Sequence, residues 1–178
     1  LEAGLGFEPM TLAVFLSTSV AARLIRRFGV RSVLTGGMLL TSAGMLRLTA
    51  VDADVSYFSH LLPGGIVTSV GLGLAIVAAT IAALVGVPSL DGGLASCLLN
   101  SSRFIGGSIG LAVLSTIAAA RTDAQLASGA GQLTALTEGY SLAFLGCGLA
   151  VLAGAVLAAT LVRTAPARDR ELLDAAEI

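Results

Sequence analysis

Five long stretches of the chain contain almost no charged residue, and no other feature limits its possible folds as strongly. They cover residues 3–22, 32–51, 61–87, 92–120 and 140–162, and the third and fifth hold no charge at all. A helix needs about 20 mostly apolar residues to cross a bilayer. Soluble helices carry a charged face, and membrane barrels use shorter alternating segments. The sequence therefore predicts an all-α integral membrane protein: five transmembrane helices within residues 1–163, followed by a tail over 164–178.

The composition agrees with a surface that faces lipid. Hydrophobic residues make up 56% of the 178 residues and charged residues only 12%, whereas soluble domains have about 25% charged residues. A net charge of −1 creates no field that would attract nucleic acid. The lipid bilayer is the first partner that the sequence predicts.

The positions of the arginines predict the orientation. One cluster follows the first stretch and another follows the fifth, whereas the opposite side holds only Arg47 and Arg121 beside acidic residues. Arginine-rich loops stay in the cytoplasm. We therefore expect a multi-pass protein of a bacterial cell membrane, with the N-terminal end outside and the tail inside. The clustered arginines are Arg23, Arg26, Arg27 and Arg31, then Arg163, Arg168 and Arg170.

The segments between the stretches suggest where helices begin and end. Pro9 and Pro63 lie near the predicted helix starts, where a missing N–H costs little. Residues 88–93 read as a tight turn and residues 121–139 as a flexible connector. The chain opens on Leu1, so we expect it to be part of a longer protein.

Small residues recur every four positions in three of the stretches. Helices in membranes associate through such residues because lipid supplies no hydrophobic driving force. We interpret these stripes as helix-packing faces. They are Ser102, Gly106 and Gly110 in the fourth stretch, Gly146, Ala150, Gly154 and Ala158 in the fifth, and Ser69, Gly73 and Val77 in the third.

Ionisable residues inside membrane helices are costly and point to function. Arg103 is the most deeply placed, and it shares a helix face with Asn100, Gly107 and Gly110. It could anchor the inner interface against Asp91, or it could act in gating or substrate passage. The candidate cavity and gating residues are Asn100, Arg103, Thr80, Ser17 and Glu8.

No pattern in the sequence indicates catalysis. No cluster of His, Cys, Asp and Glu predicts a metal site, and no nucleophile has a nearby general base. We therefore expect neither a cofactor nor an enzyme.

Residues 93–112 and 3–13 resemble helices of the major facilitator superfamily, in particular its fourteen-helix drug:proton antiporter group. The segment 23–31 is similar to the superfamily's inner-loop motif, carried here by Arg23, Arg27, Gly29 and Arg31. Arg26 stands where that motif often has Asp, Phe104 where the group usually has Gln, and Glu8 where it has an apolar residue. The first departure puts the motif's charge-pair gating role in doubt.

This resemblance implies the last five helices of a proton-coupled exporter of drug-like molecules. The first, third and fourth helices would approach the central cavity, and the missing N-terminal half would be a partner. A dedicated exporter of one metabolite stays open as an alternative. A membrane scaffold that transports nothing is a further one.

Overall fold

The structure is a computed structural model that describes residues 2–49 and 62–162 (side chains from Pro9 onward, except that of Ser89), and its regular structure there is entirely helical. Five long helices follow one another, so the predicted five-helix all-α fold is confirmed. The predicted tail 164–178 lies outside the described residues. The helices are α1 (Glu2–Phe28), α2 (Val30–Leu48), α3 (Leu62–Leu84), α4 (Gly92–Ala127) and α5 (Gln132–Leu161), with a short 3-10 helix, η2 (Ser89–Asp91), before α4.

Three of these helices, α3, α4 and α5, are long and apolar enough to cross a membrane. The other two long helices are less apolar. Helix α1 carries arginines in its last turns, and α2 has only 19 residues with an arginine near each end. Large apolar side chains lie on the outside, among them Phe104 (77% exposed) and Leu111 (71% exposed). Such an exterior suits lipid, since lipid solvates apolar side chains as well as a protein core does.

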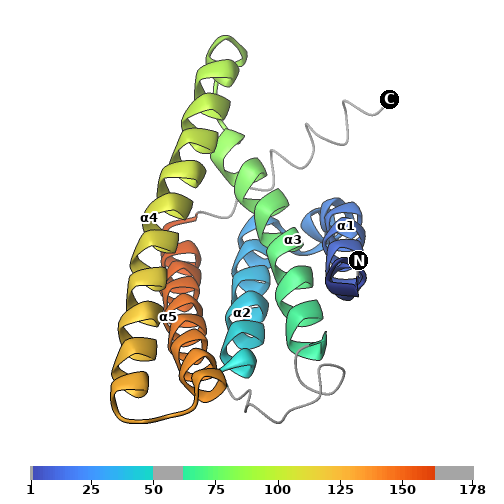
Figure 1. The fold of residues 1–178 in the computed structure, drawn as a ribbon. Coiled ribbons are helices and arrows are strands. Elements are labelled where there is room, and N and C mark those ends of the chain that lie inside the picture. Colours follow the sequence, from blue (N-terminus) through green and yellow to red (C-terminus); the bar gives the residue numbers. More distant parts are fainter. Residues whose placement is uncertain (1, 50–61, 163–178) are drawn as a thin grey trace.

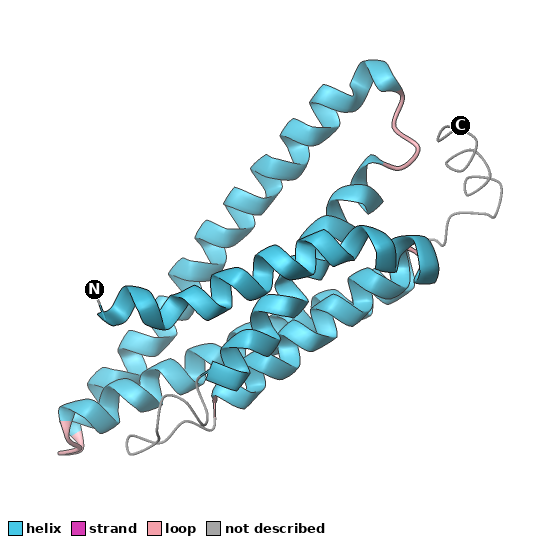
Figure 2. Cartoon of the chain, turned by 90° about the vertical axis from the view of Figure 1, so that its right-hand side faces the viewer, coloured by secondary structure: helices cyan, strands magenta, loops and turns pink. Residues whose placement is uncertain are grey.

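Helix α2 lies at the centre of the bundle and packs against α3 on one side and α5 on the other. Helix α1 packs on α3, and α4 packs on α5 (Figure 1). Helices α3 and α4 meet at the turn that joins them and diverge away from it. The helices are inclined to one another, and α1, which begins at the N label, crosses the others at a clear angle (Figure 2). No residue of α4 is buried, so its outward side has no partner among the described residues.

The closest approach of two helix backbones lies between α2 and α3. A Cβ added at Gly71 of α3 would lie 2.5 Å from the backbone nitrogen of Thr41 and 2.6 Å from the carbonyl oxygen of Gly37, both in α2. Only glycine allows two backbones to approach so closely. The sequence stripe Ser69, Gly73 and Val77 missed this face, and Gly73 packs instead on α1 near the Val14 carbonyl.

Side-chain hydrogen bonds tie α2 to α5 along its length. Arg31 donates to the Ala159 carbonyl at one end of α2. Ser42 donates to the Gly148 carbonyl at 2.8 Å in the middle. Ser141 donates to the carbonyl of Thr49 at 2.7 Å, just beyond the other end. Backbone carbonyls thus accept bonds across this interface at three levels, which fixes the two helices against each other.

Two predicted loops are largely helical. Helix α1 continues through the first arginines to Phe28, and Gly29 with φ 82° is the single residue between α1 and α2. The expected connector 121–139 is also wrong, because α4 continues to Ala127 and α5 begins at Gln132. An ion pair of 2.7 Å between Arg121 and Glu138 joins the two helices there. Pro9 likewise lies inside α1 rather than at its start.

Candidate functional site

Arg103 is the residue that joins α4 to α3. Its guanidinium donates to the Thr80 hydroxyl at 2.7 Å and to the Ile76 carbonyl at 3.0 Å. The Thr80 hydroxyl in turn donates to the same carbonyl at 2.8 Å. These hydrogen bonds go to α3 and not to Asp91, the partner that an anchoring role predicted. The structure therefore brings together two of the residues singled out from the sequence, Arg103 and Thr80.

Asn100 and the glycines near Arg103 lie in the open. Asn100 is exposed and makes no hydrogen bond within the described ranges. A Cβ added at Gly106, Gly107 or Gly110 would meet no atom within 4 Å. Phe104 projects outward beside them. Among the described residues, this part of α4 is thus a polar and small-residue surface that α3 contacts mainly through Arg103.

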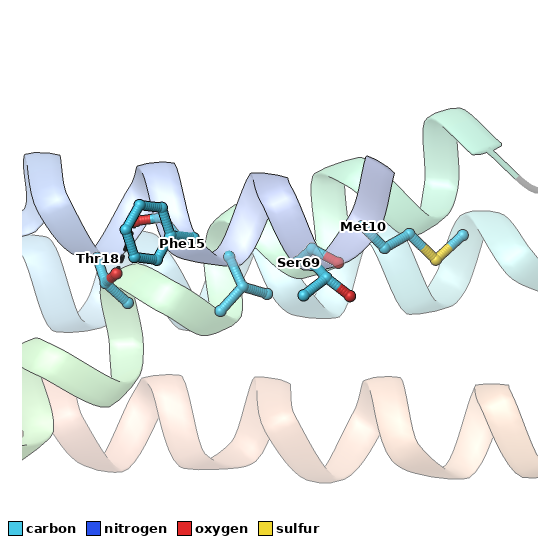
Figure 3. Close-up of a pocket in the computed structure, with 6 residues that line it drawn as sticks. Met10, Phe15, Thr18 and Ser69 are labelled. Carbon is cyan, nitrogen blue, oxygen red and sulfur yellow. Dashed lines mark hydrogen bonds between the residues drawn. The ribbon is translucent and has the colours of Figure 1, made fainter. Parts of the chain in front are cut away.

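A second feature is an open groove of about 560 Å³ between α1 and α3 (Figure 3). Its wall is mostly apolar, with hydroxyls from three side chains. Thr18, one of them, donates to the Phe15 carbonyl at 2.8 Å. Such a wall suits amphipathic molecules, because a few hydroxyls give polar contacts along a mainly apolar surface. The lining residues are Met10, Thr11, Val14, Phe15, Thr18 and Ser69.

Two candidate residues from the sequence, Ser17 and Glu8, have different positions relative to this groove. Ser17 is buried at 7% exposure in the α1–α3 contact, where its hydroxyl donates to the Val14 carbonyl at 2.8 Å. The neighbouring Thr18 lines the groove instead. Glu8 lies on α1 immediately before Pro9, but its side chain is outside the described part.

The groove and the Arg103 cluster occupy one face of α3. Ser69 and Thr80 are eleven residues apart, which is three turns of helix and about 16 Å along the axis. Their spacing places both on the same side of α3, with Gly73 and Ile76 between them. The sequence analysis named Ser69 and Gly73 as one stripe and Thr80 as a separate candidate. It did not join them into one face, because hydroxyls in membrane helices commonly bond to their own backbone and are weak signals singly.

The inner-loop arginines separate into two kinds. Arg31 is engaged with the Ala159 carbonyl at the end of α5. Arg23 and Arg27 are exposed on α1, and Arg27 lies over the Phe28 ring at 5.5 Å. Gly29 has the positive φ that the sharp turn between α1 and α2 requires.

The predicted packing glycines of α5 contact two different helices. A Cβ at Gly146 would lie 3.0 Å from Leu114 of α4, and one at Gly154 would lie 2.6 Å from Met38 of α2. Ala150 between them is exposed. In the described part of the chain, no group of His, Cys, Asp and Glu could hold a metal ion.

Comparison with known proteins identifies relatives of this chain. No family model matches the chain. The puromycin resistance protein pur8 of Streptomyces alboniger is 33% identical over 89% of the chain and 33% of its own length. The cephamycin export protein CmcT of Amycolatopsis lactamdurans is 32% identical over 90% of the chain and 32% of its own length.

A third relative carries the superfamily in its name. The uncharacterized MFS-type transporter EfpA of Mycobacterium tuberculosis is 31% identical over 100% of the chain and 36% of its own length. The chain therefore spans about a third of the length of the curated relatives that it matches.

Proposed function

Since the chain belongs to the major facilitator superfamily of transporters, we propose that it forms the last five helices of a fourteen-helix exporter that moves drug-like molecules out of the cell in exchange for protons. The observation that carries this proposal is the match to resistance and export proteins along nearly the whole chain. Members of this superfamily are transporters and not enzymes.

The Arg103 contact supports a gating role for α4. Alternating access requires groups of helices to rock against one another around a central site. Helix α4 holds α3 mainly through Arg103, Thr80 and the Ile76 carbonyl, whereas α2 and α5 are tied at three levels. We assign Arg103 the role of closing the space between α3 and α4 at their joined end, and breaking its two hydrogen bonds would let α4 move.

The groove between α1 and α3 fits the substrate class. Its apolar wall with hydroxyls from Thr11, Thr18 and Ser69 would hold amphipathic compounds without demanding one geometry. Glu8 precedes this groove on α1, and we assign it a proton-binding role at the outer mouth. The remaining helices of the transporter, from its N-terminal part, would complete the cavity.

Export by the whole transporter tests the proposal. The complete gene, expressed in a drug-sensitive bacterium, should drive dye efflux that a protonophore abolishes. Arg103→Ala should lower the efflux rate by an order of magnitude or more. Losing a charged group's hydrogen bonds, worth about 1.5–3 kcal/mol, would make the closed arrangement of α3 and α4 at least about tenfold less populated, and the transport cycle needs that arrangement. Arg103→Lys should retain part of the rate. Arg47→Ala is the matched control, because Arg47 is exposed and makes no hydrogen bond within the described residues.

Two outcomes of the same experiment would contradict the proposal. Normal efflux from Arg103→Ala at normal expression would remove Arg103 from the mechanism. Efflux that persists in protonophore would remove proton coupling.

A dedicated natural-product exporter is the second candidate. Two relatives are named for single compounds, puromycin and cephamycin, and this naming favours it. A whole transporter that moves none of a broad panel of dyes, yet protects against one antibiotic class, would decide for this candidate. A scaffold without transport predicts that Asn100→Ala, Arg103→Ala and Thr80→Val leave every activity intact.

A further inference from the structure

Helix α1 has two faces with different surroundings. One face packs on the bundle, where Ala21 is fully buried and Ile25 contacts the small core cluster around Val33. On the opposite face Leu16 is 55% exposed and Val20 is 44% exposed. This outward face is apolar over its middle turns, as a lipid-facing surface is.

The same outward face ends in two arginines. Arg23 and Arg27 are four residues apart, so they lie on one side of the helix, and their spacing continues the line from Leu16 through Val20. Both are exposed. An apolar face that ends in paired cations has the polarity profile of one bilayer leaflet, with the acyl region first and the headgroup region after it.

The two arginines have no acidic partner in the described part of the chain. Residues 9–49 contain no Asp or Glu at all, and the ion pair described between α4 and α5 is far along the sequence, at Arg121 and Glu138. Arg31 is occupied by the α5 carbonyl. Within the ranges 9–49 and 62–162, the charges of Arg23 and Arg27 are therefore not paired with a carboxylate.

An aromatic ring packs against Arg27 at the end of α1. Phe28, the last residue of α1, is 58% exposed, and the Arg27 guanidinium lies 5.5 Å from its ring centroid. The stacked pair holds the Arg27 side chain near the helix end, beside Arg23.

We propose that Arg23 and Arg27 bind the phosphate of an anionic phospholipid, phosphatidylglycerol in particular, whose acyl chains run along Leu16 and Val20. Guanidinium groups bind phosphate through two parallel hydrogen bonds, so two of them on one helix face suit one phosphodiester. The site lies on the outside of α1, away from the bundle contact that Ala21 marks and away from Arg103. It goes beyond export, since it requires only that this end of α1 lies at a bilayer surface.

Lipid retention by the whole transporter tests the site. The purified protein, exchanged from mixed phosphatidylglycerol and phosphatidylcholine into mild detergent, is analysed by native mass spectrometry for bound lipid. Each arginine near an anionic lipid contributes roughly fivefold in affinity, so the double variant Arg23→Ala/Arg27→Ala should lose about 25-fold. Arg47→Ala, an exposed arginine at the other end of α2, should retain phosphatidylglycerol normally. Equal retention by the double variant and the wild type would overturn the proposal.

Two further arms separate lipid from other occupants. Excess inorganic phosphate should not displace phosphatidylglycerol, and complete displacement would mean a site for soluble anions instead. A fluorophore on Ser19→Cys, which is exposed one turn before Arg23, with Cys97 and Cys147 replaced by Ser, should be quenched by spin-labelled lipid. No quenching would mean that another part of the transporter covers this face. Arg23→Lys/Arg27→Lys keeps the charge and should retain most of the lipid, which separates loss of binding from loss of folding.

Discussion

Replacing Gly71 by Ala should destabilise the bundle by forcing the backbones of α2 and α3 apart. The added Cβ would lie 2.5 Å from the Thr41 nitrogen and 2.6 Å from the Gly37 carbonyl oxygen. Ordinary contact between such atoms needs about 3.5 Å, so the two helices must separate by about 1 Å. Both atoms belong to backbone and cannot turn aside. Overpacking of this kind costs about 1–3 kcal/mol.

Two other glycines make the prediction a graded series. At Gly37 the added Cβ would lie 2.9 Å from the backbone nitrogen of Ala75, so Gly37→Ala should cost less than Gly71→Ala. At the neighbouring Gly36 nothing lies within 4 Å. Gly36→Ala should therefore be neutral, or should stabilise by up to about 1 kcal/mol through helix propensity.

The stability of each variant is measured by heating the detergent-solubilised protein and quantifying the fraction that stays folded by size-exclusion chromatography. One kcal/mol corresponds to about 2–4 °C for a chain of this size. The midpoint should fall in the order Gly36→Ala, Gly37→Ala, Gly71→Ala. Equal midpoints for Gly36→Ala and Gly71→Ala would show that α2 and α3 do not approach as closely as described.

Three other predictions concern the remaining contacts. Ser42→Ala should lower stability by about 0.6–1.7 kcal/mol in the same unfolding assay, since it removes the 2.8 Å bond to the Gly148 carbonyl. With the native cysteines of the protein replaced, Ser128→Cys should react with an impermeant thiol reagent added to intact cells and Ser32→Cys should not, because the arginine-rich end faces the cytoplasm. The reverse labelling pattern would invert the topology. Gly106→Leu should leave the five described helices folded, because that position is open, yet it should reduce assembly of the complete transporter if its other helices cover α4.

Charge and hydropathy predicted the helices because burial in lipid is a property of each helix alone. A stretch such as 140–162 must be helical in a bilayer whatever it packs against, since its backbone groups can bond only within the helix. The ends of the helices were harder to predict. The region 121–139 contains polar residues and reads as a loop, but Arg121 and Glu138 meet across α4 and α5 at 2.7 Å and both helices extend beyond the apolar stretch. That pairing depends on the register of two helices, which no single segment reveals.

The contact between Arg103 and Thr80 likewise could not be predicted from the sequence. Each was a candidate from sequence alone, as a polar side chain within an apolar stretch, but the 22 residues between them gave no sign of contact. Their meeting requires the short turn at η2 to fold α4 back along α3. The groove residues Met10 and Phe15 were missed entirely, because apolar side chains on a lipid-facing helix look alike until a neighbour makes a hollow beside them.

Helix geometry explains why some small-residue stripes predicted contacts and others did not. A step of four residues rotates 40° around an α-helix, so the stripe from Gly146 to Ala158 turns through about 120° and meets both α4 and α2. Steps of four and three cancel this drift. Gly37, Thr41 and Gly44 follow that spacing on α2 and are all buried against α3. A small-residue pattern therefore predicts a single packing partner only when its spacing averages close to 3.6 residues. Even then it specifies a face and not its partner, and for Gly106 and Gly110 of α4 the described residues supply none.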